Sequence, residues 1–119
     1  RGVLPLPISV DGQRVLIYGA GDGGEMVLRE LNNNPEWNYR AIGFIDDDPL
    51  KKDKVMHGLT VFDGNGTLPE LCRENDISEI LISIRTMSPE QLKKIREVCR
   101  ETNVVLKRVQ IKIEPVDFV

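Results

Sequence analysis

The sequence predicts an α/β domain in which helices cover both faces of a mostly parallel β-sheet. Apolar runs typical of buried strands alternate with segments of helical periodicity. A glycine-rich segment at residues 19–24, Gly-Ala-Gly-Asp-Gly-Gly, joins the first apolar run to the first helical pattern. Asp46 closes the second apolar run, at the roughly 20-residue spacing found in doubly wound sheets. Together these observations favour a Rossmann-like, three-layer architecture.

The first half of the chain contains one clear βαβ unit. The first strand is expected at residues 14–18 and the first helix at residues 23–32, where an apolar stripe repeats at helical spacing. The run Asn-Asn-Asn-Pro at residues 32–35 ends that helix. The second strand is expected at residues 39–45. Residues 47–58 show no helical stripe, so a loop is expected to lead to a third strand at residues 59–62.

Capping patterns locate two helices in the second half. Thr67 and Glu70 form the first capping box, which predicts a helix ending near Asn75. Ser88 and Gln91 form the second, and an apolar face follows it. Between these helices, residues 79–84 form a buried-type strand, and the last parallel strand is expected at residues 104–106.

Right-handed crossovers would arrange the five parallel strands in the order 3-2-1-4-5. Apolar and polar residues then alternate over residues 109–113, which predicts an additional C-terminal strand. A free edge of this kind usually pairs with another strand. It would fold back on the domain, join a second copy in a homo-oligomer, or lead into a following domain.

Length and composition indicate a single domain over residues 14–119, preceded by a linker at residues 1–13 that contains Pro5 and Pro7. The net charge of −3 gives no electrostatic case for a nucleic-acid partner. We find neither a signal peptide nor an apolar run long enough to span a membrane. Because the chain starts at Arg1 rather than Met, we expect a fragment of a larger protein.

The glycine turn is the strongest candidate for a binding site. Gly19 would permit the tight turn, Gly21 would let a pyrophosphate approach the backbone, and Gly24 would let the helix pack closely on the strand. The N–H groups at the helix N-terminus attract phosphate. Asp46 would accept hydrogen bonds from the ribose hydroxyls of a nucleotide. The alternative is a tight turn in a domain that binds nothing.

Further polar residues lie near the same edge of the predicted sheet. Asp22 and Gly23 belong to the turn, where Asp22 is expected to act as the helix N-cap. Asp47 and the neighbouring Asp48 would either help to hold a ribose or base or cap the turn before Pro49, the latter being favoured for Asp48. Arg85 follows the fourth strand and would either pair with a phosphate or carboxylate or remain an exposed loop residue.

Catalytic machinery is not apparent. His57, the one histidine, has no partner nucleophile or acid at a suitable spacing and is expected to have a structural or surface role. The Tyr-x-x-x-Lys pair of short-chain dehydrogenases is absent. Cys72 and Cys99 fall on predicted helices, where we expect reduced core thiols in a cytosolic setting, and they cannot form a zinc site with a single histidine.

Residues 14–31, from Arg-Val-Leu-Ile-Tyr-Gly-Ala-Gly onward, and residues 34–49, which contain Gly-Phe-Ile-Asp-Asp-Asp-Pro, carry a family resemblance. They resemble the CoA-binding-like Rossmann domain of bacterial polysaccharide-biosynthesis proteins, the membrane-anchored nucleoside-diphosphate-sugar epimerase/dehydratase group. The resemblance covers about residues 13–114. It matches Gly19, Gly21 and Gly24 to the family's glycine turn and Asp46 and Asp47 to its acid pair.

The resemblance implies a nucleotide-binding module of a nucleotide-sugar epimerase, dehydratase or dehydrogenase, on the cytoplasmic face of the membrane. Its ligand would be NAD(H) or a UDP-sugar, with CoA as a further alternative, and the acid after the second strand favours NAD over NADP. An accessory domain of a sugar-phosphate transferase is an alternative. So are a non-catalytic NADH- or CoA-sensing module and a structural module that oligomerises through residues 109–113.

Overall fold

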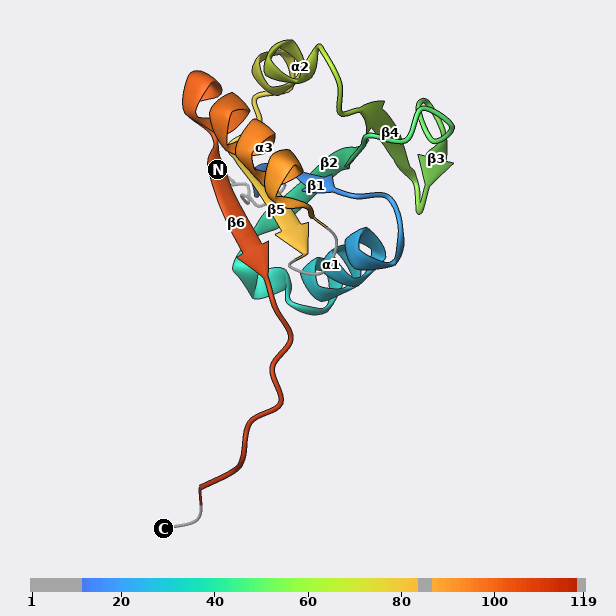
Figure 1. Ribbon diagram of the computed structural model, residues 1–119. Helices are drawn as coiled ribbons and strands as arrows, with labels where there is room; N and C mark the ends of the chain where they lie inside the picture. Colours follow the sequence, from blue (N-terminus) through green and yellow to red (C-terminus); the bar gives the residue numbers. More distant parts are fainter. Residues whose placement is uncertain (1–11, 84–86, 118–119) are drawn as a thin grey trace, which may run out of the picture.

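The computed structural model describes residues 12–83 and 87–117 (Figure 1). In chain order its elements are β1 (Gln13–Tyr18), α1 (Asp22–Asn33), the 3-10 helix η2 (Pro35–Trp37), β2 (Tyr39–Asp46), β3 (Val55–Met56), β4 (Leu59–Asp63), α2 (Leu68–Glu74), β5 (Glu79–Ser83), α3 (Pro89–Thr102) and β6 (Val105–Val109). The predicted linker at residues 1–13 lies almost entirely outside the described residues, and Gln13 already belongs to β1.

The sheet has the order β3-β4-β2-β1-β5-β6, and every pair except β3–β4 is parallel. The five parallel strands therefore follow the predicted order 3-2-1-4-5. Tyr18 on β1 pairs in register with Ile45 on β2 and with Ile82 on β5. This register brings the glycine turn, Asp46 and Ser83 to the same edge of the sheet.

Two apolar clusters fill the space on either side of the sheet. Alternate strand residues such as Leu16 and Ile80 pack with α2 and α3, while Val15, Ile17 and Leu81 face the side where α1 lies. This alternation is what a strand covered on both faces requires. The result is the predicted three-layer architecture, with α1 on one face and α2 and α3 on the other.

Of the two capping boxes that the sequence predicts, the structure contains one. Ser88 and Gln91 form the complete capping box at the start of α3, with each side chain bonded to the other residue's backbone N–H. Thr67 is the N-cap of α2, as predicted, but its side chain makes no cap hydrogen bond. Thr67 has backbone angles φ −101° and ψ 17° instead of the extended ones that a capping box uses, so this predicted box is wrong.

The loop after β2 contains a short hairpin that the sequence pattern did not predict. Val55 and Met56 form β3, which pairs antiparallel with the start of β4 at the sheet edge. His57 and Gly58 connect the two strands, and both have positive φ angles, 53° and 80°. Two such residues form the tight turns that suit a β-hairpin. His57 therefore lies in a surface turn, 3.1 Å from Glu25, which agrees with the predicted structural or surface role.

The C-terminal segment differs from the prediction. The last strand runs through Val109, and residues 110–117 form no regular secondary structure and leave the body of the domain (Figure 1). The additional strand predicted over residues 109–113 is therefore wrong for this chain. A strand needs a neighbour to share its backbone hydrogen bonds, and the 100% exposure of Ile113 shows that no described residue packs against it.

Cys72 on α2 and Cys99 on α3 are free thiols, buried in the cluster between these helices and the sheet. Burial raises the pKa of both thiols to about 11. The prediction that both cysteines are unpaired residues of the core is thus confirmed. None of the helices in the described ranges has the length and apolar character needed to cross a membrane.

Candidate functional site

The glycine turn carries the chain directly from the end of β1 into α1. Gly19 has a φ angle of +100° and donates its N–H to Ile45 O at 2.6 Å, which ties the turn to β2. Glu25 N–H donates to Gly21 O at 2.9 Å and makes the first i→i−4 bond of α1. The N–H groups before Glu25 in the first turn have no intrahelical acceptor, so they can bind an anion.

Gly19 and Gly24 are required by the fold. Gly19 has a positive φ angle that strains any side chain. A Cβ atom on Gly24 would overlap the carbonyl oxygen of Gly19, so a glycine is needed where α1 packs on the turn. These two glycines make the sharp strand-to-helix turn, as the sequence predicts.

Gly21 is different, because the fold does not require a glycine there. Its backbone angles, φ −110° and ψ −152°, suit any residue. A Cβ atom on Gly21 would meet only Lys51 Nζ, at 3.7 Å, among the described atoms. Gly21 is also the N-cap of α1, and Asp22 is its first residue. The expected N-cap role of Asp22 is therefore wrong, since Gly21 already supplies the extended angles and the first accepting carbonyl.

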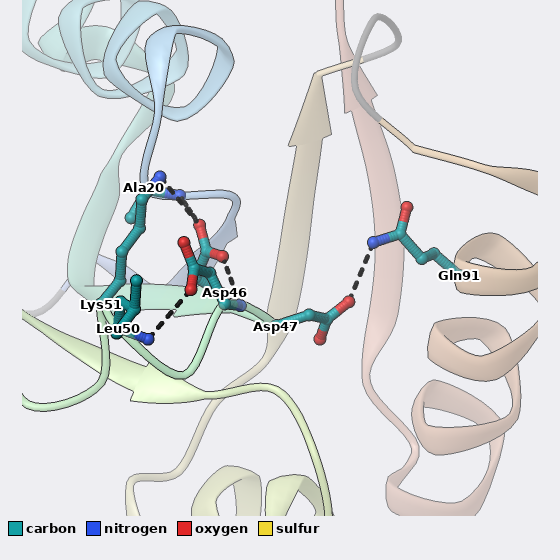
Figure 2. A network of polar contacts seen from close by, with 7 residues as sticks. Ala20, Asp46, Asp47, Leu50, Lys51 and Gln91 are labelled. Carbon is teal, nitrogen blue, oxygen red and sulfur yellow. Dashed lines mark hydrogen bonds and ion pairs between the residues drawn. The ribbon is translucent and has the colours of Figure 1, made fainter.

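Asp46 lies at the end of β2 and faces the glycine turn (Figure 2). Its Oδ2 accepts a hydrogen bond from Ala20 N at 2.8 Å and lies 3.7 Å from Lys51 Nζ. Its Oδ1 accepts a hydrogen bond from Asp48 N at 2.9 Å. The carboxylate is thus fixed beside the turn, as predicted, and each oxygen still has a lone pair for a ribose hydroxyl.

Asp47 points the other way, toward α3 (Figure 2). Its Oδ2 accepts hydrogen bonds from Tyr18 Oη at 2.6 Å and Gln91 Nε2 at 2.9 Å. Its Oδ1 is buried against Gly64 and has no hydrogen-bond partner among the described residues. Asp47 therefore links the end of β1 to the first turn of α3. The next acid, Asp48, caps its own turn through Leu50 N, which confirms the favoured structural role.

Burial raises the pKa of Tyr18 far above its ordinary value, and the hydrogen bond to Asp47 raises it further. The phenol is therefore neutral throughout the physiological pH range, and its O–H donates a hydrogen bond to the Asp47 carboxylate. A neutral donor and an anionic acceptor form a charge-assisted hydrogen bond, which is stronger than one between two neutral groups.

These groups enclose a cavity of about 210 Å³ at the carboxyl edge of the sheet. Among its described lining residues, Asp22, Asp46 and Asp47 are acidic, and Lys51 alone is basic. The remaining lining residues are Tyr18, Gly19, Gly21, Gly23, Gly24 and Gln91. The structure thus brings together all of the predicted site residues except Arg85, which lies outside the described residues.

Lys51 and Gln91 were not predicted as site residues. Lys51 lies in the run Lys-Lys-Asp-Lys, which is typical of a solvated loop, and nothing in the sequence shows that its side chain turns back to the glycine turn. Gln91 was predicted only as part of a capping box. Its side chain completes the capping box and also reaches the site, because Oε1 accepts from Ser88 N while Nε2 donates to Asp47.

A second cavity, of about 410 Å³, lies away from the glycine turn. It is lined mainly by apolar side chains and by the last residues of β6, and its lining includes Leu31, Trp37, Leu81 and Val109. It is larger, but it has no glycine turn and no helix N-terminus. Lys107 and Arg108 also line it, and Lys107 is paired with Glu79 at 3.0 Å. The glycine turn and the unpaired N–H groups of a helix N-terminus, which together suit a diphosphate, are at the smaller cavity.

A family model described as a CoA-binding domain matches residues 8–109. The chain is 32% identical over 94 residues to the probable polysaccharide biosynthesis protein EpsC of Bacillus subtilis (strain 168). It is 28% identical over 99 residues to the capsular polysaccharide biosynthesis protein CapD of Staphylococcus aureus. These alignments cover 79% and 82% of this chain but 16% of each relative, so the chain spans about a sixth of their length.

Solved structures give the same relation. The UDP-D-quinovosamine 4-dehydrogenase from Vibrio fischeri is 33% identical, with a TM-score of 0.69 that covers 81% of this chain and 77% of that one. A Rex-family repressor, RSP, has a TM-score of 0.70 over 91% of this chain and 50% of its own, and at 14% identity this likeness shows the fold. The predicted relation to polysaccharide-biosynthesis proteins, and the Rossmann-like fold, are confirmed.

Replacing Gly21 and Gly24 separately by serine tests the roles assigned to them. Gly24→Ser should lower the free energy of unfolding by about 1–3 kcal/mol, because its Cβ has no room beside Gly19 O. Gly21→Ser should leave stability unchanged or slightly raised, because serine is a good N-cap residue. Urea unfolding followed by circular dichroism measures both, and equal losses in the two variants would contradict the assignment.

Tyr18→Phe tests the link to Asp47. At neutral pH the variant should be about 1 kcal/mol less stable. Because the pKa of Tyr18 is raised in the folded state, its contribution is complete below about pH 10 and is lost as the pH rises further. The stability difference between wild type and variant, measured from pH 8 to 11.5, should therefore shrink above pH 10. A stability advantage of wild type over the variant that stays constant or grows over this range would refute the link.

Proposed function

We propose that the glycine turn and Asp46 bind a nucleotide that carries a diphosphate. The chain belongs to the CoA-binding domain family, whose model matches residues 8–109. The N–H groups of the first turn of α1 would bind the phosphates, and Asp46 would bind the ribose. NAD(H) is the first candidate ligand, and a UDP-sugar and CoA are the alternatives.

Gly21 is the observation that carries this proposal. The fold requires glycine at positions 19 and 24, but Gly21 has extended backbone angles, and a Cβ atom there would contact only the end of the Lys51 side chain, at 3.7 Å. Because the packing of the protein does not require a glycine at this position, we interpret the missing side chain as space for a ligand. Gly21 lines the same cavity as the first turn of α1, whose unpaired N–H groups would bind the diphosphate there.

The acids beside the cavity bear on which nucleotide binds. Asp46, Asp47 and Asp48 follow one another at the end of β2. A phosphate on the ribose that Asp46 holds would be repelled by these carboxylates. NADP and CoA carry such a phosphate, whereas NAD and UDP-sugars have free ribose hydroxyls. In support, a repressor of the same fold was crystallised with β-NADH, and the dehydrogenase relative is named for a UDP-sugar.

We place the domain, over residues 14–119, as an accessory or regulatory module in a longer protein. The parent would be a nucleotide-sugar epimerase, dehydratase or dehydrogenase of polysaccharide biosynthesis, anchored in the membrane with this module on its cytoplasmic face. The relation to EpsC and CapD supports this placement. The described site supplies binding groups, and the catalytic groups of the reaction would come from another domain.

Residues 110–117 favour a second role, in contact between copies of the domain. Ile111, Ile113 and Val116 are exposed on an extended segment that leaves the sheet after β6. β6 is also an edge strand, so one side of it has no neighbour in the described sheet. Exposed apolar residues next to an open edge are typical of a contact with a second chain.

Ligand titrations test the main proposal. NADH should bind the purified domain in a fluorescence titration, and calorimetry with a UDP-sugar and with CoA should rank the alternatives. Gly21→Val should abolish binding because its side chain fills the phosphate position. Asp46→Ala should weaken binding by about 1–3 kcal/mol, because charge-assisted hydrogen bonds to the ribose are lost.

Each variant needs a thermal unfolding curve, since Asp46 also fixes the turn through Ala20 N. Phe44→Leu, in the buried core beneath the turn, is a control that should change stability more than affinity. If none of the three ligands binds the wild-type domain, or if Gly21→Val binds as well as wild type, the proposed site is refuted.

The contact role is tested by shortening the chain after Val109. Multi-angle light scattering of the purified domain should show an oligomer that becomes a monomer when residues 110–119 are removed. An unchanged mass in the shortened chain would rule this segment out as the interface.

A further inference from the structure

Lys51 reaches back from the loop after β2 and lies over the glycine turn (Figure 2). Its Nζ is 3.7 Å from Asp46 Oδ2 and 3.7 Å from the position of a Cβ atom on Gly21. The ammonium group therefore borders the space that we assign to the diphosphate. The contact with Asp46 holds the ammonium group there, and the distance to the Gly21 position shows how close it lies to the turn.

The loop that carries Lys51 is held in place by its backbone. Lys51 N donates to Asp48 O at 3.0 Å, and Lys54 N donates to Lys51 O at 3.1 Å. Asp53 N in turn donates to Val61 O on β4 at 2.9 Å. These bonds hold the Cα of Lys51 at the sheet edge, so its side chain starts from a fixed point within reach of the glycine turn.

Lys51 also changes the charge balance of the cavity. The three acids that line it would repel a diphosphate, which carries negative charge of its own. Among the described lining residues, Lys51 is the group that offsets this repulsion. Its side chain is 35% exposed and that of Asp46 is 15% exposed, so the pair is only partly screened by solvent.

The contact between Lys51 and Asp46 is weak enough to be exchanged. At 3.7 Å it exceeds the length of a direct hydrogen bond, so the three N–H donors of Lys51 are not committed to Asp46. Asp46 Oδ2, for its part, already accepts the hydrogen bond from Ala20 N. An arriving phosphate, with more charge and more acceptor oxygens, would be the better partner for the ammonium.

We infer that Lys51 is the phosphate-binding cation of this site, and that it exchanges Asp46 for the ligand's diphosphate when a nucleotide binds. This inference rests on the proposed function. The exchange has a second effect, because Asp46 Oδ2 loses a competing cation and becomes a better acceptor for the ribose hydroxyls. Phosphate binding and ribose binding are thereby coupled through one ion pair.

Inorganic pyrophosphate and NADH are the probes that test it, each titrated into the wild-type domain and three variants. Lys51→Gln should lower the affinity for both ligands about tenfold or more, because one charge-assisted contact is lost. Lys51→Arg should stay within about threefold of wild type. Lys52→Gln, in the same loop but not lining the cavity, should match wild type. Unfolding curves confirm that each variant is folded.

The outcomes separate this inference from the proposed function. If the wild-type domain binds NADH, and Lys51→Gln binds both NADH and pyrophosphate as tightly as wild type does, the role of Lys51 is overturned and the site stands. Tighter binding by Lys51→Gln would show that the pair with Asp46 only blocks the site, which also overturns it. If the wild-type domain binds neither NADH, a UDP-sugar, CoA nor pyrophosphate, the proposed function fails and this inference with it.

Discussion

The close contact between α1 and the end of β1 is the constraint on which the site depends. Gly24 packs so tightly on Gly19 O that no side chain fits between them. This contact sets the N-terminus of α1 directly above the sheet edge, where Gly19 N–H is also bonded to Ile45 O. The unpaired N–H groups of the helix therefore open beside the end of β2. A looser helix would move them away from Asp46 and divide the site.

Two consecutive acids at the end of β2 connect this site to the rest of the domain. Asp46 is the last residue of β2 and faces the glycine turn, while Asp47, in the bend that follows, faces α3 (Figure 2). Asp46 is thereby placed for ligand chemistry. Asp47 holds Tyr18 and Gln91 and joins the strand ends to the helix layer on the other face. One dipeptide thus serves both the site and the scaffold that positions it.

The sequence predicted what depends on periodicity and on glycine, namely the strand order, the three layers, the turn and the position of Asp46. It missed what depends on contacts between distant residues. Lys51 looked like a solvated lysine because its approach to Gly21 depends on the loop's bonds to β4. The alternation at residues 109–113 predicted a strand, but alternation alone supplies no neighbouring strand. Asp22 was expected to cap α1 because a glycine N-cap has no side chain to reveal it.

The most direct measurement is an NMR titration of the ¹⁵N-labelled domain with NADH, a UDP-sugar and CoA in turn. If the mouth of α1 receives a diphosphate, the backbone amide signals of residues 20–24 will shift and saturate with at least one ligand, together with those of Asp46 and the loop that carries Lys51. If those amides stay unchanged with all three ligands while signals around Trp37 and Val109 shift, the ligand binds in the larger cavity and the account is contradicted.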